Sequence, residues 1–241
     1  FSVISGDMSF VGPRPALFNQ DDLIALRNKK GIEKLRSTLL ELSKKVHVKE
    51  DKGIFRLPID RVFTKKGFGT VITGTVSSGT AVIGDSVEIL PGNRICKIRG
   101  LHSHREKVNE VNIGDRAACN LAGIDKISLQ RGHQISSPGY FNDVKFLGVD
   151  LSLLNSAMKP ITQNQRVRIH LGTQEVISRL ALIGEKNLQP GKNIPALLKL
   201  ETPLVAGMHD RFILRTYSPV NTVGGGLVLT NHINGKWKKT K

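Results

Sequence analysis

The sequence has few aromatic residues, few cysteines and no long apolar run. Aromatic residues make up 5% of the 241 positions, so a core must be built mainly from Val, Ile and Leu. Cys96 and Cys119 lie in apolar, strand-like contexts, which favours reduced, buried thiols over a disulfide. A membrane-spanning helix needs about 18 consecutive apolar residues, and no such run occurs. Since no signal peptide is evident either, we expect a cytoplasmic protein without a membrane partner.

The sequence also lacks the motifs of nucleotide hydrolysis. It contains no Gly-x4-Gly-Lys-Ser/Thr phosphate loop, and the glycine clusters at 67–69 and 224–226 are not followed by a helix pattern with Lys-Ser/Thr. The glycines at 224–226 instead indicate a close backbone approach, either between strands or to an RNA backbone. The run Asn28-Lys29-Lys30-Gly31 lacks the Asp of the guanine-binding motif Asn-Lys-x-Asp. We therefore expect that this chain alone neither binds nor hydrolyses GTP, and that it carries no cofactor and no catalytic residue.

A metal site is not expected either. His102, His104, Cys96 and Cys119 are the residue types that bind zinc, but their spacing fits no common zinc pattern. Scattered residues of these types more often belong to the core or the surface.

The charge balance is strongly basic. The chain has 36 Lys and Arg against 20 Asp and Glu, a formal net charge of +16, with a pI near 10.1. A basic surface of this size favours a polyanionic partner such as RNA or DNA. A basic but simply soluble protein would have the same composition, so charge alone leaves both possibilities open.

The clearest structural pattern lies in residues 54–79, IFRLPIDRVFTKKGFGTVITGTVSSG. Apolar residues alternate along the first half, the second half is rich in β-branched residues, and a glycine-rich bend at 67–69 separates the two. Gly74 lies inside the second predicted strand, which indicates a bulge or a close backbone approach. Further short strands with regular turn spacing follow, so the pattern predicts curved, barrel-like sheets.

Four segments carry a family resemblance: IDRVFTKKGFGTVITGTVSSG, VIGDSVEILP, NIGDRAACNLAG and LQRGHQISSPG. They resemble the second domain of translational GTPases, and are most similar to the bacterial selenocysteine-specific elongation factor, a relative of elongation factor Tu. RVRIHLGTQEV, LETPLVAG and DRFILRTYSPVNTVGGG resemble the third domain of that family. The resemblance implies a mainly β fold, with two consecutive β-barrels (domain II-like and domain III-like) preceded by short helices.

The resemblance also implies a division of the chain. Residues 32–52 would be the last helix of a GTPase domain and a charged linker, 53–141 the first barrel, 142–231 the second, and 232–241 a basic linker. In the family, domains that grip an mRNA hairpin follow that linker. The intact, monomeric factor would use GTP and Mg²⁺ to deliver selenocysteyl-tRNA to the ribosome.

Two sets of site residues follow from the resemblance. Asp60, Arg61 and Arg116 would form the pocket for the selenocysteyl end of the tRNA, where an Arg pair favours a selenolate over a hydroxyl. In that pocket Asp60 would either hold the amino group or fix an Arg; a plain surface ion pair is the other interpretation. The residues that would contact tRNA from the second barrel are Arg166, Arg168, His170, Arg211, Arg215, Thr222 and Gly224. One departure is Met208-His209 before Asp210, where relatives usually have a glycine.

Residues 1–31 have a different resemblance. The block GDMSFVGPRP, with PALFNQ after it, is similar to the C-terminal part of bacterial undecaprenyl-phosphate sugar phosphotransferases, and a short helix ending near Gly31 is predicted after it. The alternative function is therefore a fragment of a sugar-1-phosphate transferase with a polyprenyl-phosphate acceptor, fused to an RNA-binding barrel pair. A mis-joined sequence and a genuine fusion would both explain the change of family near residue 31.

Overall fold

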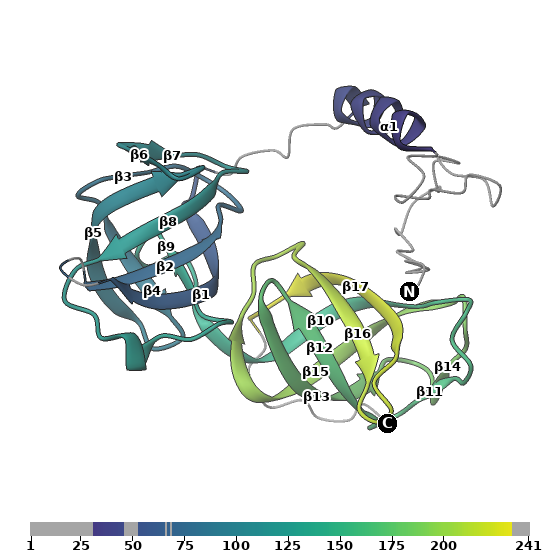
Figure 1. The fold of residues 1–241 in the computed structure, drawn as a ribbon. Helices are drawn as coiled ribbons and strands as arrows, with labels where there is room; N and C mark the ends of the chain where they lie inside the picture. Colours follow the sequence, from purple (N-terminus) through teal and green to yellow (C-terminus); the bar gives the residue numbers. More distant parts are fainter. Residues whose placement is uncertain (1–30, 46–52, 66, 68, 233–241) are drawn as a thin grey trace. The chain divides into compact units, whose positions relative to one another are not determined.

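The structure, a computed structural model, describes residues 31–45, 53–65, 67 and 69–232. The chain divides into two compact units, Phe1–Glu50 and Asp51–Lys241. The described part of the first unit is helix α1 (Ile32–Lys45) and that of the second is built from β-strands (Figure 1). The transferase-like segment and the helix predicted before Gly31 lie outside the described residues. The expectation of a mainly β chain with two barrels is confirmed.

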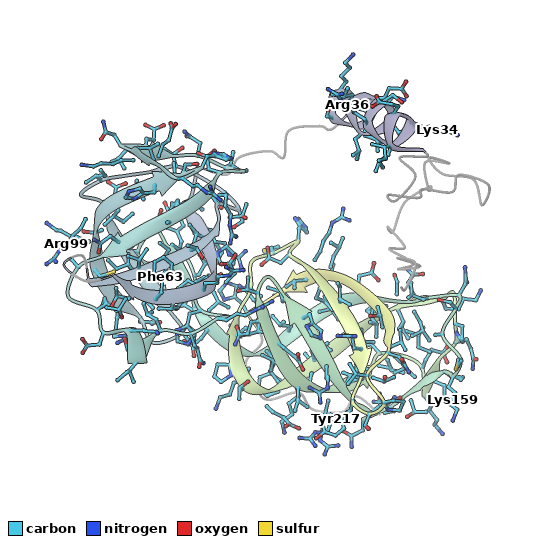
Figure 2. The ribbon with its side chains drawn as sticks, in the orientation of Figure 1. Lys34, Arg36, Phe63, Arg99, Lys159 and Tyr217 are labelled. Carbon is cyan, nitrogen blue, oxygen red and sulfur yellow. The ribbon has the colours of Figure 1, made fainter. Side chains whose placement is uncertain are left out.

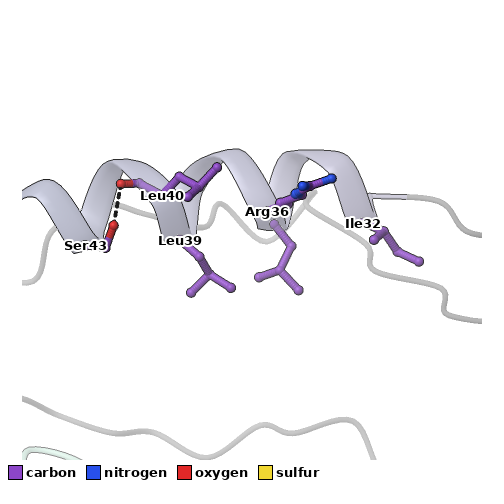
Figure 3. Close-up of a pocket in the computed structure, with 6 residues that line it drawn as sticks. Ile32, Arg36, Leu39, Leu40 and Ser43 are labelled. Carbon is purple, nitrogen blue, oxygen red and sulfur yellow. Dashed lines mark hydrogen bonds between the residues drawn. The ribbon is translucent and has the colours of Figure 1, made fainter. Parts of the chain in front are cut away.

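The charges at the two ends of helix α1 interact favourably with the helix dipole, because Glu33 lies in its first turn and Lys44 and Lys45 lie in its last. Its apolar side chains, among them Leu39 and Leu40, gather around a shallow hollow on the helix surface (Figure 3). Leu39 is 55% exposed and no described residue of α1 is buried. Packing within the described residues therefore adds little to the stability of this helix. No described helix has the length and apolar content needed to cross a membrane.

The first barrel closes by pairing strands that are distant in sequence. Its sheet runs in the order β4-β9-β1-β2-β8-β5, β4 also pairs with β5, and β6 extends the edge (Figure 1). The elements are β1 (Arg56–Lys65), β2 (Gly69–Thr75), β3 (Ala81–Val82), β4 (Ser86–Leu90), β5 (Arg94–Ser103), β6 (Glu106–Val108), β7 (Glu110–Val111), β8 (Arg116–Leu121), a 3-10 turn (Lys126–Ser128) and β9 (Gln134–Ser136). The turn at 91–93 joins the paired strands β4 and β5, and the 3-10 turn lies between β8 and β9.

The core of this barrel follows the alternation seen in the sequence. Leu57 and Ile59 of β1, Ile72 of β2 and Leu101 of β5 are fully buried in one apolar cluster. Cys119 lies in the same cluster and, like Cys96, is a free buried thiol, as expected. Burial raises the pKa of Cys96 to about 11 and that of Cys119 to about 12, so both thiols stay protonated at neutral pH.

The second barrel is a closed sheet in the order β10-β15-β13-β12-β16-β17, with β17 paired to β10. The elements are β10 (Asp143–Leu153), β11 (Ile161–Thr162), β12 (Arg166–Leu171), β13 (Gln174–Leu182), β14 (Asn187–Leu188), β15 (Asn193–Val205), β16 (Arg211–Thr216) and β17 (Thr222–Thr230). Inward residues such as Val167, Ile169 and Leu214 fill the core, and the residues between them face outward.

The strand that closes the second barrel was not predicted as a strand. β17 contains Gly224, Gly225 and Gly226, and glycine normally weakens a strand. A Cβ on Gly226 would lie 1.8 Å from the backbone oxygen of Asp150, and one on Gly225 would lie 2.5 Å from that of Phe212. The glycines thus let β17 fit between β10 and β16. The sequence indicated a close backbone approach at these glycines, and the structure shows one between neighbouring strands.

Candidate nucleic-acid interface

A β-bulge in the first barrel presents Asp60. The pairing of β1 with β2 shifts register between Ile59 and Arg61, so Asp60 has no cross-strand partner of its own. Gly74 lies opposite Ile59, and a Cβ there would lie 2.2 Å from the backbone oxygen of Pro58. The close approach predicted at this glycine is therefore confirmed, and it is what lets β2 run beside the bulge.

Asp60 contacts both strands that follow β1 in the sheet. The hydroxyl of Thr73 donates a hydrogen bond to Asp60 Oδ1 over 2.8 Å, and the Arg116 guanidinium forms an ion pair with Oδ2. The Asp60 side chain is 22% exposed and that of Arg116 is 49% exposed. The structure thus brings Asp60 and Arg116 together, and it places Arg61 beside the bulge on the exposed surface.

The electrostatics of this group keep Asp60 ionised. Burial by itself would raise the pKa of Asp60, but the hydrogen bonds from Arg116 and Thr73 and the charges of Arg116 and Arg61 outweigh it, so the pKa lies below its usual value. This ion pair fits an Asp60 that fixes an Arg, and it fits a plain surface ion pair equally well, so the role of Asp60 stays a prediction. The negative charge of Asp60 would partly cancel the attraction of Arg61 and Arg116 for an anion.

The predicted residues of β12 lie on the outer face of the second barrel, but two of them are already paired. Arg166 forms an ion pair with Glu201, and Arg168 forms one with Glu175. The guanidinium carbons of Arg166 and Arg168 lie 4.3 Å and 5.2 Å from the centre of the Tyr217 ring, which Figure 2 labels. No local pattern in the sequence points to Glu175, Glu201 or Tyr217, because their positions beside β12 depend on strand register.

The remaining predicted residues are on β16 and β17. Arg215 lies directly opposite Arg168 on β12 and opposite Thr222 on β17, whereas Arg211 is exposed and lies opposite Leu227. Gly224 is buried, and a Cβ there would lie 2.4 Å from the backbone oxygen of Ser152. Packing of β17 on β10 accounts for this glycine, and its contact with tRNA stays a prediction.

Sequence reasoning also missed Arg56, whose side chain joins the two barrels. Arg56 Nη1 donates to both carboxylate oxygens of Asp210, at 2.9 and 2.7 Å, and Nε donates to Gln134 Oε1 at 2.9 Å. The guanidinium carbon lies 4.8 Å from the centre of the Phe141 ring. Asp210 also accepts a hydrogen bond from the Gly207 backbone N–H at 2.8 Å. We call Arg56, Gln134, Phe141, Gly207 and Asp210 the barrel clamp.

A second contact connects the barrels near the bulge. The Thr173 hydroxyl, in the turn between β12 and β13, donates to the backbone oxygen of Ile59 over 2.8 Å. Ile59 directly precedes Asp60, so the second barrel touches the strand segment that presents the bulge. The two groups of predicted residues therefore lie on different barrels, and this hydrogen bond joins the barrels close to the first group.

The turn before β16 departs from the glycine expected in relatives, and here His209 has a φ of +64°. This left-handed conformation costs an L-residue roughly 1–2 kcal/mol, whereas glycine adopts it freely. Replacing His209 with Gly should therefore raise the free energy of unfolding by about 0.5–1 kcal/mol, after the greater backbone entropy of glycine is subtracted. Urea denaturation of the chain measures this change.

The matched control is His102→Gly, because His102 lies in β5 and is exposed. There the same substitution should lower stability by about 0.5–1 kcal/mol. Equal changes at both positions would show that the conformation of His209 carries no strain.

Two domain families match the chain. Residues 69–136 match elongation factor Tu domain 2, and residues 149–234 match the β-barrel domain of the selenocysteine-specific elongation factor. These ranges include Arg116 and most of the second barrel, and they give no support to the transferase alternative.

Individual relatives agree with the domain matches. The chain is 34% identical over 199 residues to the selenocysteine-specific elongation factor of Desulfomicrobium baculatum, and 35% identical over 204 residues to that of Escherichia coli. Each match covers 83% of this chain, but only 31% and 30% of the two relatives, so the chain spans about a third of their length. The fold resembles the apo structure of translation elongation factor SelB from Methanococcus maripaludis, with a TM-score of 0.73 at 22% identity, over 85% of this chain and 49% of the other.

Proposed function

We propose that this chain is the two-barrel part of a selenocysteine-specific elongation factor, in which the first barrel holds the aminoacyl end of selenocysteyl-tRNA and the second contacts its stem. The observation that carries the proposal is the group at the bulge, where Asp60, Thr73 and Arg116 are joined and Arg61 lies beside them. The two domain matches and the curated relatives support the same assignment.

The chemistry of the aminoacyl group suits these charges. A selenol is largely ionised at neutral pH, so selenocysteine on tRNA offers a selenolate and an amino group, whereas serine offers a neutral hydroxyl. Arg116 and Arg61 would attract the selenolate. Asp60 would hold Arg116 in place. Selectivity would then come from one charge–charge interaction that serine lacks.

The remaining steps would belong to the intact factor. The sequence contains neither the phosphate loop nor the guanine motif, so the residues of this chain do not fit GTP and Mg²⁺. In the proposed parent factor, a separate GTPase domain would bind them and drive delivery to the ribosome in the cytoplasm. Arg166, Arg168, His170, Arg211, Arg215 and Thr222 would contact tRNA phosphates, which supply affinity rather than sequence choice.

Replacing Arg116 with Ala in the intact factor tests the pocket. We expect the affinity for selenocysteyl-tRNA to fall about tenfold, equivalent to about 1.4 kcal/mol, with little change for seryl-tRNA, because only the selenolate loses a charge partner. Protection of the aminoacyl ester against hydrolysis measures both affinities.

The control variant is Arg99→Ala, which removes an exposed Arg from β5 of the same barrel (Figure 2). It should change both affinities equally and only slightly. Equal losses for the two tRNAs in the Arg116 variant would reject the pocket.

A further inference from the structure

One carboxylate on the outer face of the second barrel is surrounded by basic side chains. Glu175 of β13 lies opposite His170 of β12, and Arg168 of β12 lies opposite Arg215 of β16. Like charges directly opposite each other on neighbouring strands destabilise a sheet unless a counter-charge lies between them. Glu175 is the carboxylate that supplies this counter-charge.

Glu175 satisfies only part of the group. Its Oε1 is paired with Arg168 Nη1, and its Oε2 lies 3.8 Å from His170 Nε2, which is beyond hydrogen-bond distance. Arg168 is also held from the other side, since its Nε donates to the backbone oxygen of Tyr217 at 3.2 Å. Glu175 is therefore paired mainly with Arg168, and it does not provide a hydrogen-bond partner for His170.

Two buried polar atoms of the group have no hydrogen-bond partner among the described residues. They are His170 Nε2 and Arg215 Nε. Buried polar atoms in native proteins nearly always have a partner, so an unpaired one calls for an explanation. Arg215 Nε carries a hydrogen, and His170 Nε2 carries one when the ring is protonated, so the ligand that would satisfy both atoms is an anion with several acceptor oxygens. Both residues also interact electrostatically with Glu175.

The charges around His170 point to the same ligand. Burial, followed by the charges of Arg215 and Arg168, lowers the pKa of His170, and Glu175 only partly opposes this. His170 is thus mainly neutral at neutral pH in the free protein. An added anion would favour its protonated form and complete a site with three cations.

We propose that Arg168, His170 and Arg215 form a binding site for one RNA phosphate, and that Glu175 occupies this site until the phosphate displaces it. The inference rests on the proposed contact between the second barrel and RNA. A phosphodiester matches the charge of the carboxylate and has oxygens enough to reach all three side chains. A protein carboxylate would only repeat the contact that Glu175 already makes, so RNA is the better occupant.

The test uses the full chain and a short RNA duplex without an amino acid. Glu175→Gln removes the competing charge but keeps an oxygen that can accept from Arg168. We expect this variant to bind the duplex about 5–10-fold more tightly at low salt, and its slope of log K against log salt to become steeper by about one. In the wild type, affinity should rise as the pH falls from about 7.5 to about 5.5, and His170→Gln should remove that rise.

The matched control is Glu185→Gln, which makes the same charge change at an exposed residue of the same barrel. It should leave the salt slope unchanged. If it tightens binding as much as Glu175→Gln, or if Glu175→Gln binds no better than the wild type, the site is wrong although RNA binding stands. If the wild type does not bind the duplex at all, the proposed function of the second barrel fails together with the site.

Inorganic phosphate separates the two sources of the anion. We expect the His170 ring resonances to shift with the duplex and to shift much less with inorganic phosphate at the same phosphate concentration. An equal shift would overturn the assignment to RNA and make the ligand a free anion.

Discussion

Replacing Arg56 with Met should lower the free energy of unfolding by about 3–5 kcal/mol, because it leaves the Asp210 carboxylate without its cation at the junction of the barrels. Arg56 and Asp210 are 10% and 20% exposed at their side chains, and the guanidinium also supports Gln134 and Phe141. Met keeps most of the apolar stem of Arg, so the loss of stability measures what the charge and the hydrogen bonds of Arg56 contribute. Urea denaturation, followed by fluorescence of probes on each barrel, measures it.

The same experiment should show whether the barrels unfold together. In the wild type we expect one transition for both probes, and in the Arg56→Met variant two separated transitions. The control is Arg166→Met, which breaks the ion pair with Glu201 on the exposed face of the second barrel. Because both groups of that pair face water, the urea midpoint should hardly move. Equal effects of the two substitutions would contradict a special role for the barrel clamp.

Replacing Gly226 with Ala should lower stability by about 3 kcal/mol or more, or prevent the second barrel from closing. The new Cβ would lie 1.8 Å from the backbone oxygen of Asp150, 2.9 Å from its carbonyl carbon and 3.2 Å from the Phe212 ring. Backbone atoms of a paired strand cannot move aside as a flexible side chain can. Thermal unfolding followed by circular dichroism measures the loss.

Gly100→Ala is the matched control for this substitution. Gly100 lies in β5, and a Cβ there would have no heavy atom within 4 Å. Alanine also restricts the unfolded chain more than glycine does, so we expect a gain of up to about 1 kcal/mol. If Gly226→Ala were tolerated as well as Gly100→Ala, β17 could not be packed between β10 and β16 as described.

Much of the fold could be predicted because barrel strands alternate along the sequence. Leu57 and Ile59 lie on the apolar positions of the alternating pattern, and both of them are fully buried. Prediction failed where the local sequence opposes the local structure. The glycines of β17 lower its strand propensity, and the strand forms only because β10 and β16 lie on either side of it.

The candidate site was predictable in composition but not in pairing. The arginines of β12 could be expected to face outward because they alternate along the strand with the apolar residues Val167 and Ile169, which face the core. Arg168 and Arg166 already have carboxylate partners, which come from β13 and β15 respectively. No local pattern in the sequence shows that these two strands place a carboxylate beside β12. Arg56 is the clearest case, since it belongs to a strand of the first barrel and its partner is 154 residues away.

The barrel clamp has a consequence for the order in which a nascent chain acquires its structure. The last strand of the first barrel ends at Ser136, so that barrel can close 74 residues (210 − 136) before Asp210 is synthesised. At roughly 5–20 residues per second, Arg56 waits about 4–15 s for its carboxylate. During that interval, Gln134 is its side-chain partner from the same barrel, and the surface that will meet the second barrel is still open to water. Until the second barrel forms, this surface of the half-made protein is accessible to chaperones and proteases.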